Sequence, residues 1–73
     1  MKEKEHVAVF EKTSTGWSAY VPDLPGLGVA GETFEETQSL LREGVDFHIE
    51  GLVADGDPIP EPATRVMTLP ISA

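Results

Sequence analysis

Cysteine is absent from this chain of 73 residues, which excludes disulfides and metal sites built from thiolates. Basic residues are scarce, five against 13 acidic ones, and the net charge of −8 disfavours nucleic-acid binding by this chain alone, because phosphates require Lys and Arg. No apolar run approaches the roughly 20 residues that a membrane span needs. The N-terminal sequence MKEKEH has charges of both signs and no apolar core, so we expect no secretion signal. These absences favour a cytoplasmic protein that contacts neither membranes nor nucleic acid directly.

The length of the chain predicts one domain, spanning 1–73, near the lower limit at which a single apolar core suffices. A core of this size supplies only about 3–5 kcal/mol of stability. Burial of apolar surface against a second copy would add to that figure, so we expect a homodimer or a homotetramer.

The acidic residues are concentrated in one part of the chain. Between residues 32 and 61, Arg42 is the one basic residue among nine acidic ones, so this part carries the whole net charge. The acidic residues there are Glu32, Glu35, Glu36, Glu43, Asp46, Glu50, Asp55, Asp57 and Glu61. Charge of one sign attracts and orients a basic protein partner, although acidic residues also serve simply to keep a small protein in solution.

Three short segments have the composition and alternation of β-strands. They cover 6–12, 16–21 and 27–30, with turn residues at 13–16 between the first two. Apolar side chains fall on both faces of the predicted sheet, as Phe10 does on one face of the first segment and Val9 on the other. One face is therefore a candidate contact with another subunit.

The segment between the second strand and the helix, YVPDLPGLGVAG at 20–31, contains a firmly held loop. Pro22 and Pro25 fix φ and remove backbone donors, which ends the sheet ladder. Three glycines supply the positive φ that a sharp loop needs; they are Gly26, Gly28 and Gly31. Such a loop either shapes a binding surface or only connects the sheet to the helix.

A helix is predicted over about 34–53. Thr33 and Glu36 have the spacing of a capping box at its start. An apolar stripe runs along one side, formed by Phe34, Leu41, Val45 and Leu52, and acidic residues occupy the opposite side. Leu40 and Phe47 lie about 100–120° from the stripe, where they either fill the edge of the core or touch another chain.

After the helix, Gly and Pro within 54–58 are a stop signal, and 59–62 is too rich in proline for a sheet. Residues 65–69, RVMTL, have the composition of a last strand. The sequence therefore predicts an α+β domain ordered β-β-β-α-β. One helix packs on an antiparallel sheet of three or four strands, in two layers.

Nothing in the sequence specifies an active site or a cofactor. His48 falls near the centre of the apolar stripe, so we expect a core residue whose ring nitrogens bond to the backbone. No metal-ligand spacing joins it to the other histidine, His6, so we expect no metal site. Asp23, in the proline loop, either caps a turn or takes a charged partner. A hydrolase that uses His48 with Asp23 is a third and least favoured hypothesis.

Four motifs in order resemble the HicB-like antitoxin family over most of the chain, from about residue 7 to residue 62. They are YVPDLPG at the end of a strand, GETFEE at the helix start, HIEGL near the helix end, and DGDPIPEP after it. The resemblance implies a β-β-β-α-β fold of the degenerate ribonuclease-H type without catalytic acids. It also implies a partner, a small basic HicA-like toxin that cleaves messenger RNA, and self-association through this domain.

On this interpretation the protein is a binding module and not an enzyme. The residues expected to bind the toxin are Asp23, Leu24, Glu36, Glu43, Asp46 and Glu50, and those expected between copies of the chain are Phe10, Leu40 and Phe47. Many members of the family carry a C-terminal DNA-binding domain, and none follows here, so we expect no direct operator binding. The alternative is an orphan homo-oligomer, structural or binding a small ligand, that has no toxin.

Overall fold

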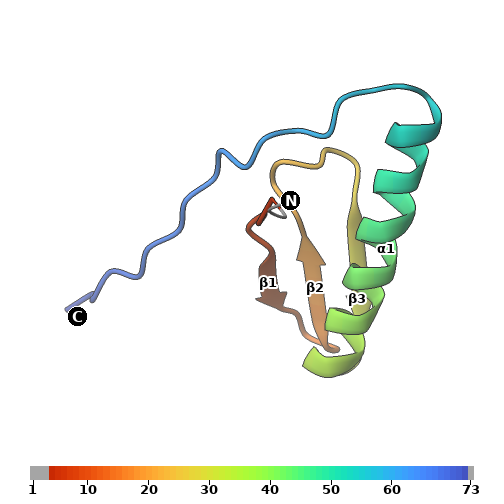
Figure 1. Cartoon of the computed structure of the whole chain (residues 1–73). Coiled ribbons are helices and arrows are strands. Elements are labelled where there is room, and N and C mark those ends of the chain that lie inside the picture. Colours follow the sequence, from red (N-terminus) through yellow and green to blue (C-terminus); the bar gives the residue numbers. More distant parts are fainter. Residues whose placement is uncertain (1–3, 73) are drawn as a thin grey trace.

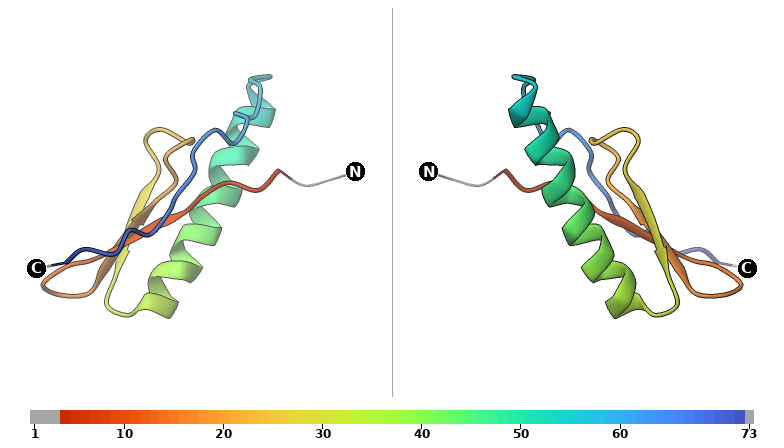
Figure 2. Two further views of the ribbon diagram at one scale, coloured as in Figure 1. Left: turned by 90° about the vertical axis from the view of Figure 1, so that its left-hand side faces the viewer. Right: turned by 90° about the vertical axis from the view of Figure 1, so that its right-hand side faces the viewer.

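The computed structural model describes residues 4–72 and shows an antiparallel sheet with one helix packed on it (Figure 1). The strands are β1 (Val9–Lys12), β2 (Trp17–Tyr20) and β3 (Gly28–Gly31), in the sheet order β1-β2-β3. The helix α1 (Phe34–Ala54) follows them and lies on one side of the sheet (Figure 2). The predicted α+β arrangement of three strands followed by one helix is confirmed.

The register of the sheet decides which side chains face the helix. Phe10 pairs with Ala19, and Ala19 pairs with Val29, so this row of apolar residues lies on one face. The β1–β2 hairpin closes where the Thr13 amide donates to the Gly16 carbonyl at 2.9 Å. A Cβ atom at Gly16 would collide with the Gly31 carbonyl oxygen, so the hairpin requires glycine there for space.

The proline loop consists of two successive turns. The Leu24 amide donates to the Val21 carbonyl at 3.0 Å, and the Leu27 amide donates to the Leu24 carbonyl at 3.3 Å. In the second turn Gly26 has φ = +86°, directly after a proline, as in a type II turn.

The expectation that Gly28 and Gly31 also supply positive φ is wrong, because both lie within β3 in extended backbone. Gly31 is required for a different reason. A Cβ atom there would lie 2.6 Å from Oγ1 of Thr37, where the helix passes close to the strand.

Both ends of α1 are capped. Oγ1 of Thr33 accepts a hydrogen bond from the Glu36 amide, and Oε1 of Glu36 accepts one from the Glu32 amide, each at 3.0 Å. The first is the Thr33 bond of the predicted capping box, whereas the second differs from it, because Glu36 reaches back to the residue before the N-cap and not to the Thr33 amide. At the other end, Gly56 has φ = +74°, and the Asp57 amide donates to the Leu52 carbonyl at 2.9 Å. This is the arrangement of a Schellman cap, which stops the helix.

The core lies between α1 and the strands β2 and β3. Its buried apolar residues are Ala19, Val21, Leu24 and Leu41, each at most 5% exposed. Thr37 is fully buried beside them, and its hydroxyl donates to the Thr33 carbonyl at 2.8 Å. Because the helix packs over β2 and β3 and not over β1, the sheet is incompletely covered at its β1 side.

His48 is not a core residue, contrary to the sequence prediction. Its side chain is half-buried, and no hydrogen bond to its ring is found among residues 4–72. The helix of 21 residues is about 30 Å long, whereas strands of four residues are only about 13 Å long. The C-terminal half of α1 therefore extends past the sheet, and its inner side is only partly covered there.

The predicted strand at 65–69 is also not formed in the single chain. Within the described residues, everything after the helix lacks regular secondary structure, and residues 65–72 extend away from the sheet on the β1 side (Figure 1). The composition of this segment favours extended backbone, but a strand also needs a neighbour, and the preceding residues are fixed elsewhere by contacts described below.

Candidate functional site

The acidic outer side of α1 is one candidate surface. Glu43, Asp46 and Glu50 are all exposed, and their spacing of three and four residues places them on one side of the helix. Among residues 4–72, no ion pair neutralises any of the three. This surface therefore presents unpaired negative charge to solvent.

Glu36 belongs to the same side of the helix, but one of its oxygens already has a structural role. Oε1 accepts the Glu32 amide hydrogen at the start of the helix at 3.0 Å, while the side chain remains exposed. The other carboxylate oxygen and the net charge are still available to a partner.

The Asp23 carboxylate binds a distant part of the same chain. Oδ2 accepts hydrogen bonds from the amides of Ala63 at 3.0 Å and Thr64 at 3.2 Å, and Oδ1 accepts one from the Thr64 hydroxyl at 3.0 Å. The Ala63 amide, with the two donors of Thr64, holds the pKa of the Asp23 carboxyl below its usual value. This role could not be predicted from the sequence, because no local signal marks donors 40 and 41 residues away.

Leu24, next to Asp23, is 1% exposed and belongs to the core. Its side chain supports the proline loop from inside and is therefore not accessible to a partner protein.

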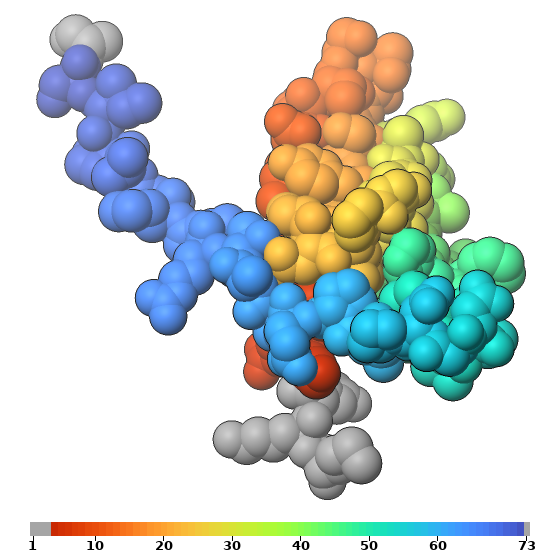
Figure 3. All heavy atoms as spheres, turned by 90° about the horizontal axis from the view of Figure 1, so that it is seen from above, coloured from red at the N-terminus to blue at the C-terminus, as the bar shows by residue number. Residues whose placement is uncertain are grey.

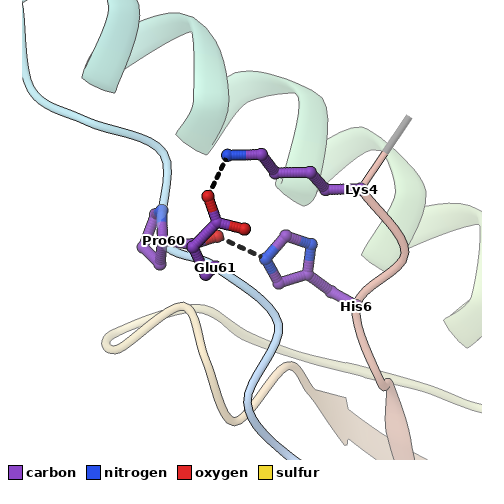
Figure 4. Close-up of polar contacts among 4 residues, drawn as sticks. All are labelled: Lys4, His6, Pro60 and Glu61. Carbon is purple, nitrogen blue, oxygen red and sulfur yellow. Dashed lines mark hydrogen bonds and ion pairs between the residues drawn. The ribbon is translucent and has the colours of Figure 1, made fainter. Parts of the chain in front are cut away.

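Two further contacts hold the segment 60–64, which we call the docked segment (Figure 4). Nζ of Lys4 lies 2.6 Å from Oε1 of Glu61, and Nε2 of His6 donates to the Pro60 carbonyl at 2.7 Å. In the view from above, these residues lie against the proline loop and the N-terminal arm (Figure 3). The docked segment is thus fixed from both sides before the chain leaves the domain.

The three residues predicted to lie between copies are found in different places. Phe10 is half-buried and packs against Phe34, with ring centroids 4.7 Å apart. Leu40 is 37% exposed and Phe47 is 80% exposed, two turns apart on the same side of α1. Leu40 and Phe47 are therefore available to another chain, whereas Phe10 belongs to a hollow beside β1.

That hollow, which we call the β1 groove, has a volume of about 510 Å³ and lies where the helix does not cover β1. Its apolar lining consists of Ala8, Phe10, Val21, Leu24, Leu41, Val45 and Ile49. Its polar lining consists of His6, Gln38, Arg42 and Asp46. This groove could not be predicted from the sequence, because its existence depends on where the helix crosses the sheet.

The described residues were compared with the two chemical sites considered from sequence, a metal site and a His48–Asp23 pair. Residues 4–72 contain no group of three or more His, Asp or Glu placed to hold a metal ion. Both oxygens of Asp23 are engaged by the docked segment, which leaves the His48–Asp23 hydrolase hypothesis without a free carboxylate. In the described part of the chain, α1 lacks the apolar length needed to cross a bilayer.

Comparison with known proteins gives a consistent family assignment. A family model described as the HicB-like antitoxin of bacterial toxin–antitoxin systems matches residues 6–69. The chain is 31% identical over 68 residues to the antitoxin HicB 2 of Photorhabdus laumondii. The matched region covers 88% of this chain and 46% of that protein. It is 39% identical over 51 residues to a 14.9 kDa protein of Haemophilus phage HP1, covering 70% of this chain and 38% of that one.

The chain thus spans less than half the length of these two curated relatives. A solved structure described as "HicA3 and HicB3 toxin-antitoxin complex" is similar with a TM-score of 0.63 and 36% sequence identity. The similarity covers 77% of this chain and 65% of the other, so the sheet and helix described here have a counterpart in an assembled complex.

Proposed function

This chain belongs to the HicB-like antitoxin family, and from that premise we propose that it binds and neutralises a small, basic HicA-like toxin that cleaves messenger RNA. The observation that carries the proposal is the similarity to a chain from a HicA–HicB complex at 36% identity. The chain is then a binding module and not an enzyme. The pair acts in the cytoplasm, where the messenger RNA is.

The acidic side of α1 supports this proposal. Glu43, Asp46 and Glu50 are exposed and unpaired within residues 4–72, and the net charge of the chain is −8. A toxin that binds RNA presents basic residues for the phosphates. Opposite charges on the two surfaces speed and orient the encounter, and the bound antitoxin then occupies the surface that RNA requires.

The proline loop contributes shape more than charge. Leu24 fills the core under it, and the Asp23 carboxylate is used by the docked segment. We infer that the loop, held from inside and from its side, presents a fixed contour to a partner. A preformed surface loses little conformational entropy on binding.

We also propose that the chain self-associates as a homodimer or a homotetramer. Among residues 4–72 the buried apolar core contains four residues, which is small for an independent domain. Leu40 and Phe47 lie exposed on α1, and a large exposed aromatic side chain such as Phe47 is a frequent anchor of protein interfaces.

Co-expression with a HicA-type toxin encoded beside this chain tests the proposal. The intact chain is expected to restore growth and to co-purify with the toxin. The Glu43→Gln, Glu50→Gln variant is expected to restore growth less well than the charge-matched Glu5→Gln, Glu11→Gln control, whose side chains are also exposed but lie outside the acidic region. Failure of the intact chain to bind or rescue would favour the orphan homo-oligomer instead.

A further inference from the structure

The tail, residues 65–72, is rich in exposed apolar side chains. Its four large apolar side chains are all exposed: Val66 69%, Met67 76%, Leu69 69% and Ile71 90%. It is extended and stands clear of the rest of the molecule (Figure 3). A cluster of exposed apolar residues of this kind marks an interaction site.

The pattern of the tail suits one partner geometry. In extended backbone, alternate residues point to the same side, which places Met67, Leu69 and Ile71 together. Pro70 points to the opposite side of the tail. It lacks a backbone donor, which a strand tolerates at the edge of a sheet.

The domain has a site of matching shape and chemistry. β1 is an edge strand, hydrogen-bonded to β2 on one side only. Directly beside it lies the β1 groove, with its apolar lining of Phe10, Val45 and other residues. A strand added to the edge of β1 would place every second side chain over this groove.

We propose that the tail of one copy forms a fourth strand on the β1 edge of a second copy, with Met67 and Leu69 seated in that copy's β1 groove. Reciprocal exchange of the two tails produces a symmetric dimer. This inference rests on the self-association proposed above and names the segment that mediates it. It also explains why the sequence predicts a strand at 65–69 although this strand is not formed in a single chain.

Two observations select a second copy over other occupants. The docked segment is fixed by Asp23 at Ala63 and Thr64, and from there the chain leads away from its own domain. The tail carries Arg65 as its one charge, and the groove contains one acidic and one basic residue, Asp46 and Arg42, so the match between tail and groove is chiefly apolar. A basic toxin is attracted by acidic surfaces, and residues 65–72 contain no acidic residue.

Light scattering on the 73-residue chain is the first measurement. The intact chain is expected to be a dimer at micromolar concentration, and the Met67→Glu, Leu69→Glu variant a monomer. The control Thr68→Glu, Ser72→Glu adds the same charge at residues that point to the opposite side of the extended tail, and it is expected to remain a dimer. Because the tail lies outside the core, far-ultraviolet circular dichroism is expected to show the same helix content in all three.

A second measurement identifies which copy holds the tail. The chain contains two methionines, so a methyl-labelled methionine sample gives few signals, and a Met67→Leu variant assigns them. A deuterated chain with labelled methionine methyls is mixed with unlabelled chain and refolded. We expect nuclear Overhauser effects between the Met67 methyl and ring protons of Phe10 on the unlabelled copy.

The possible failures are distinguishable. A dimer that persists in the Met67→Glu, Leu69→Glu variant would overturn the tail exchange and leave self-association through another surface, such as Leu40 and Phe47. A monomeric intact chain would overturn both self-association and the exchange, while leaving toxin binding to be decided by the co-expression experiment.

Discussion

Asp23 and Thr64, 41 residues apart in the chain, are joined by two hydrogen bonds, one from the Thr64 amide and one from its hydroxyl. Together with the bond from Ala63 to the same carboxylate, they fix the point at which the chain leaves the domain. The proline loop therefore determines where the tail begins, in addition to connecting β2 with β3.

Replacing Asp23 with Asn is expected to loosen the docked segment. The amide retains one acceptor oxygen but loses the charge, and hydrogen bonds to a charged acceptor are stronger than those to a neutral one. Amide hydrogen exchange at Ala63 and Thr64 should accelerate on the order of tenfold. Asp57→Asn, in the exposed loop after α1, serves as the control and should leave both rates unchanged.

Acid is expected to release the same contact. The pKa of the Asp23 carboxyl lies below its usual value of 3.8, chiefly because of the Ala63 amide. Since the pKa is lowered in the folded chain, the contribution of this group to stability is complete above its unfolded pKa and is lost as pH falls through the folded value. The amide resonances of Ala63 and Thr64 should stay constant from neutral pH to about pH 4 and shift below it.

The pH titration has an internal control. The Asp23→Asn variant has no carboxyl at this position, so the same two resonances should show no such shift. A transition of equal size in that variant would assign the change to another group.

The neighbouring residues Leu40 and Leu41 offer a matched test of the core. Leu41 is 5% exposed and Leu40 is 37% exposed, on different sides of the same helix. Leu41→Ala is expected to lower the free energy of unfolding by about 2–5 kcal/mol, as buried leucines do. Leu40→Ala should cost much less, although it should weaken self-association if Leu40 lies between copies. Urea unfolding of both variants provides the comparison. Equal decreases in the free energy of unfolding would contradict the position of Leu41 in the core.

The elements that sequence predicted well are those whose signals are local. The Thr33 cap of the helix and the turn at Gly26 depend on residues within a few positions, and the structure has both. The role of Asp23 could not be predicted in this way, because the sequence around an aspartate next to prolines is the same whether it caps its own turn or binds Thr64.

The wrong predictions also have physical causes. At residues 65–69 composition indicated extended backbone correctly, but pairing is a property of two segments, and the described residues contain no neighbour for this one. His48 lies on the predicted stripe of the helix, yet the sheet beneath is shorter than α1. The β1 groove required knowledge of the helix position over β2 and β3, which no residue pattern specifies.

The acidic side of α1 is expected to act on the rate of association with the toxin. Glu43→Gln, Glu50→Gln should lower the association rate constant at low salt roughly tenfold and flatten its salt dependence, with a smaller effect on dissociation. Asp46 is left unchanged because it lines the β1 groove. In stopped-flow measurements the Glu5→Gln, Glu11→Gln control should follow the intact chain. If the two variants behave alike, the acidic residues serve solubility only.

The most direct test of the central claim is a titration of the purified toxin's RNA cleavage with this chain. Neutralisation by occupation of the toxin's RNA-binding surface predicts that cleavage falls linearly with added chain and ends at a fixed whole-number ratio of the two proteins. It also predicts that RNA and this chain compete for the toxin. Cleavage that continues unchanged with the chain in excess, although the toxin is folded and active, would contradict the account.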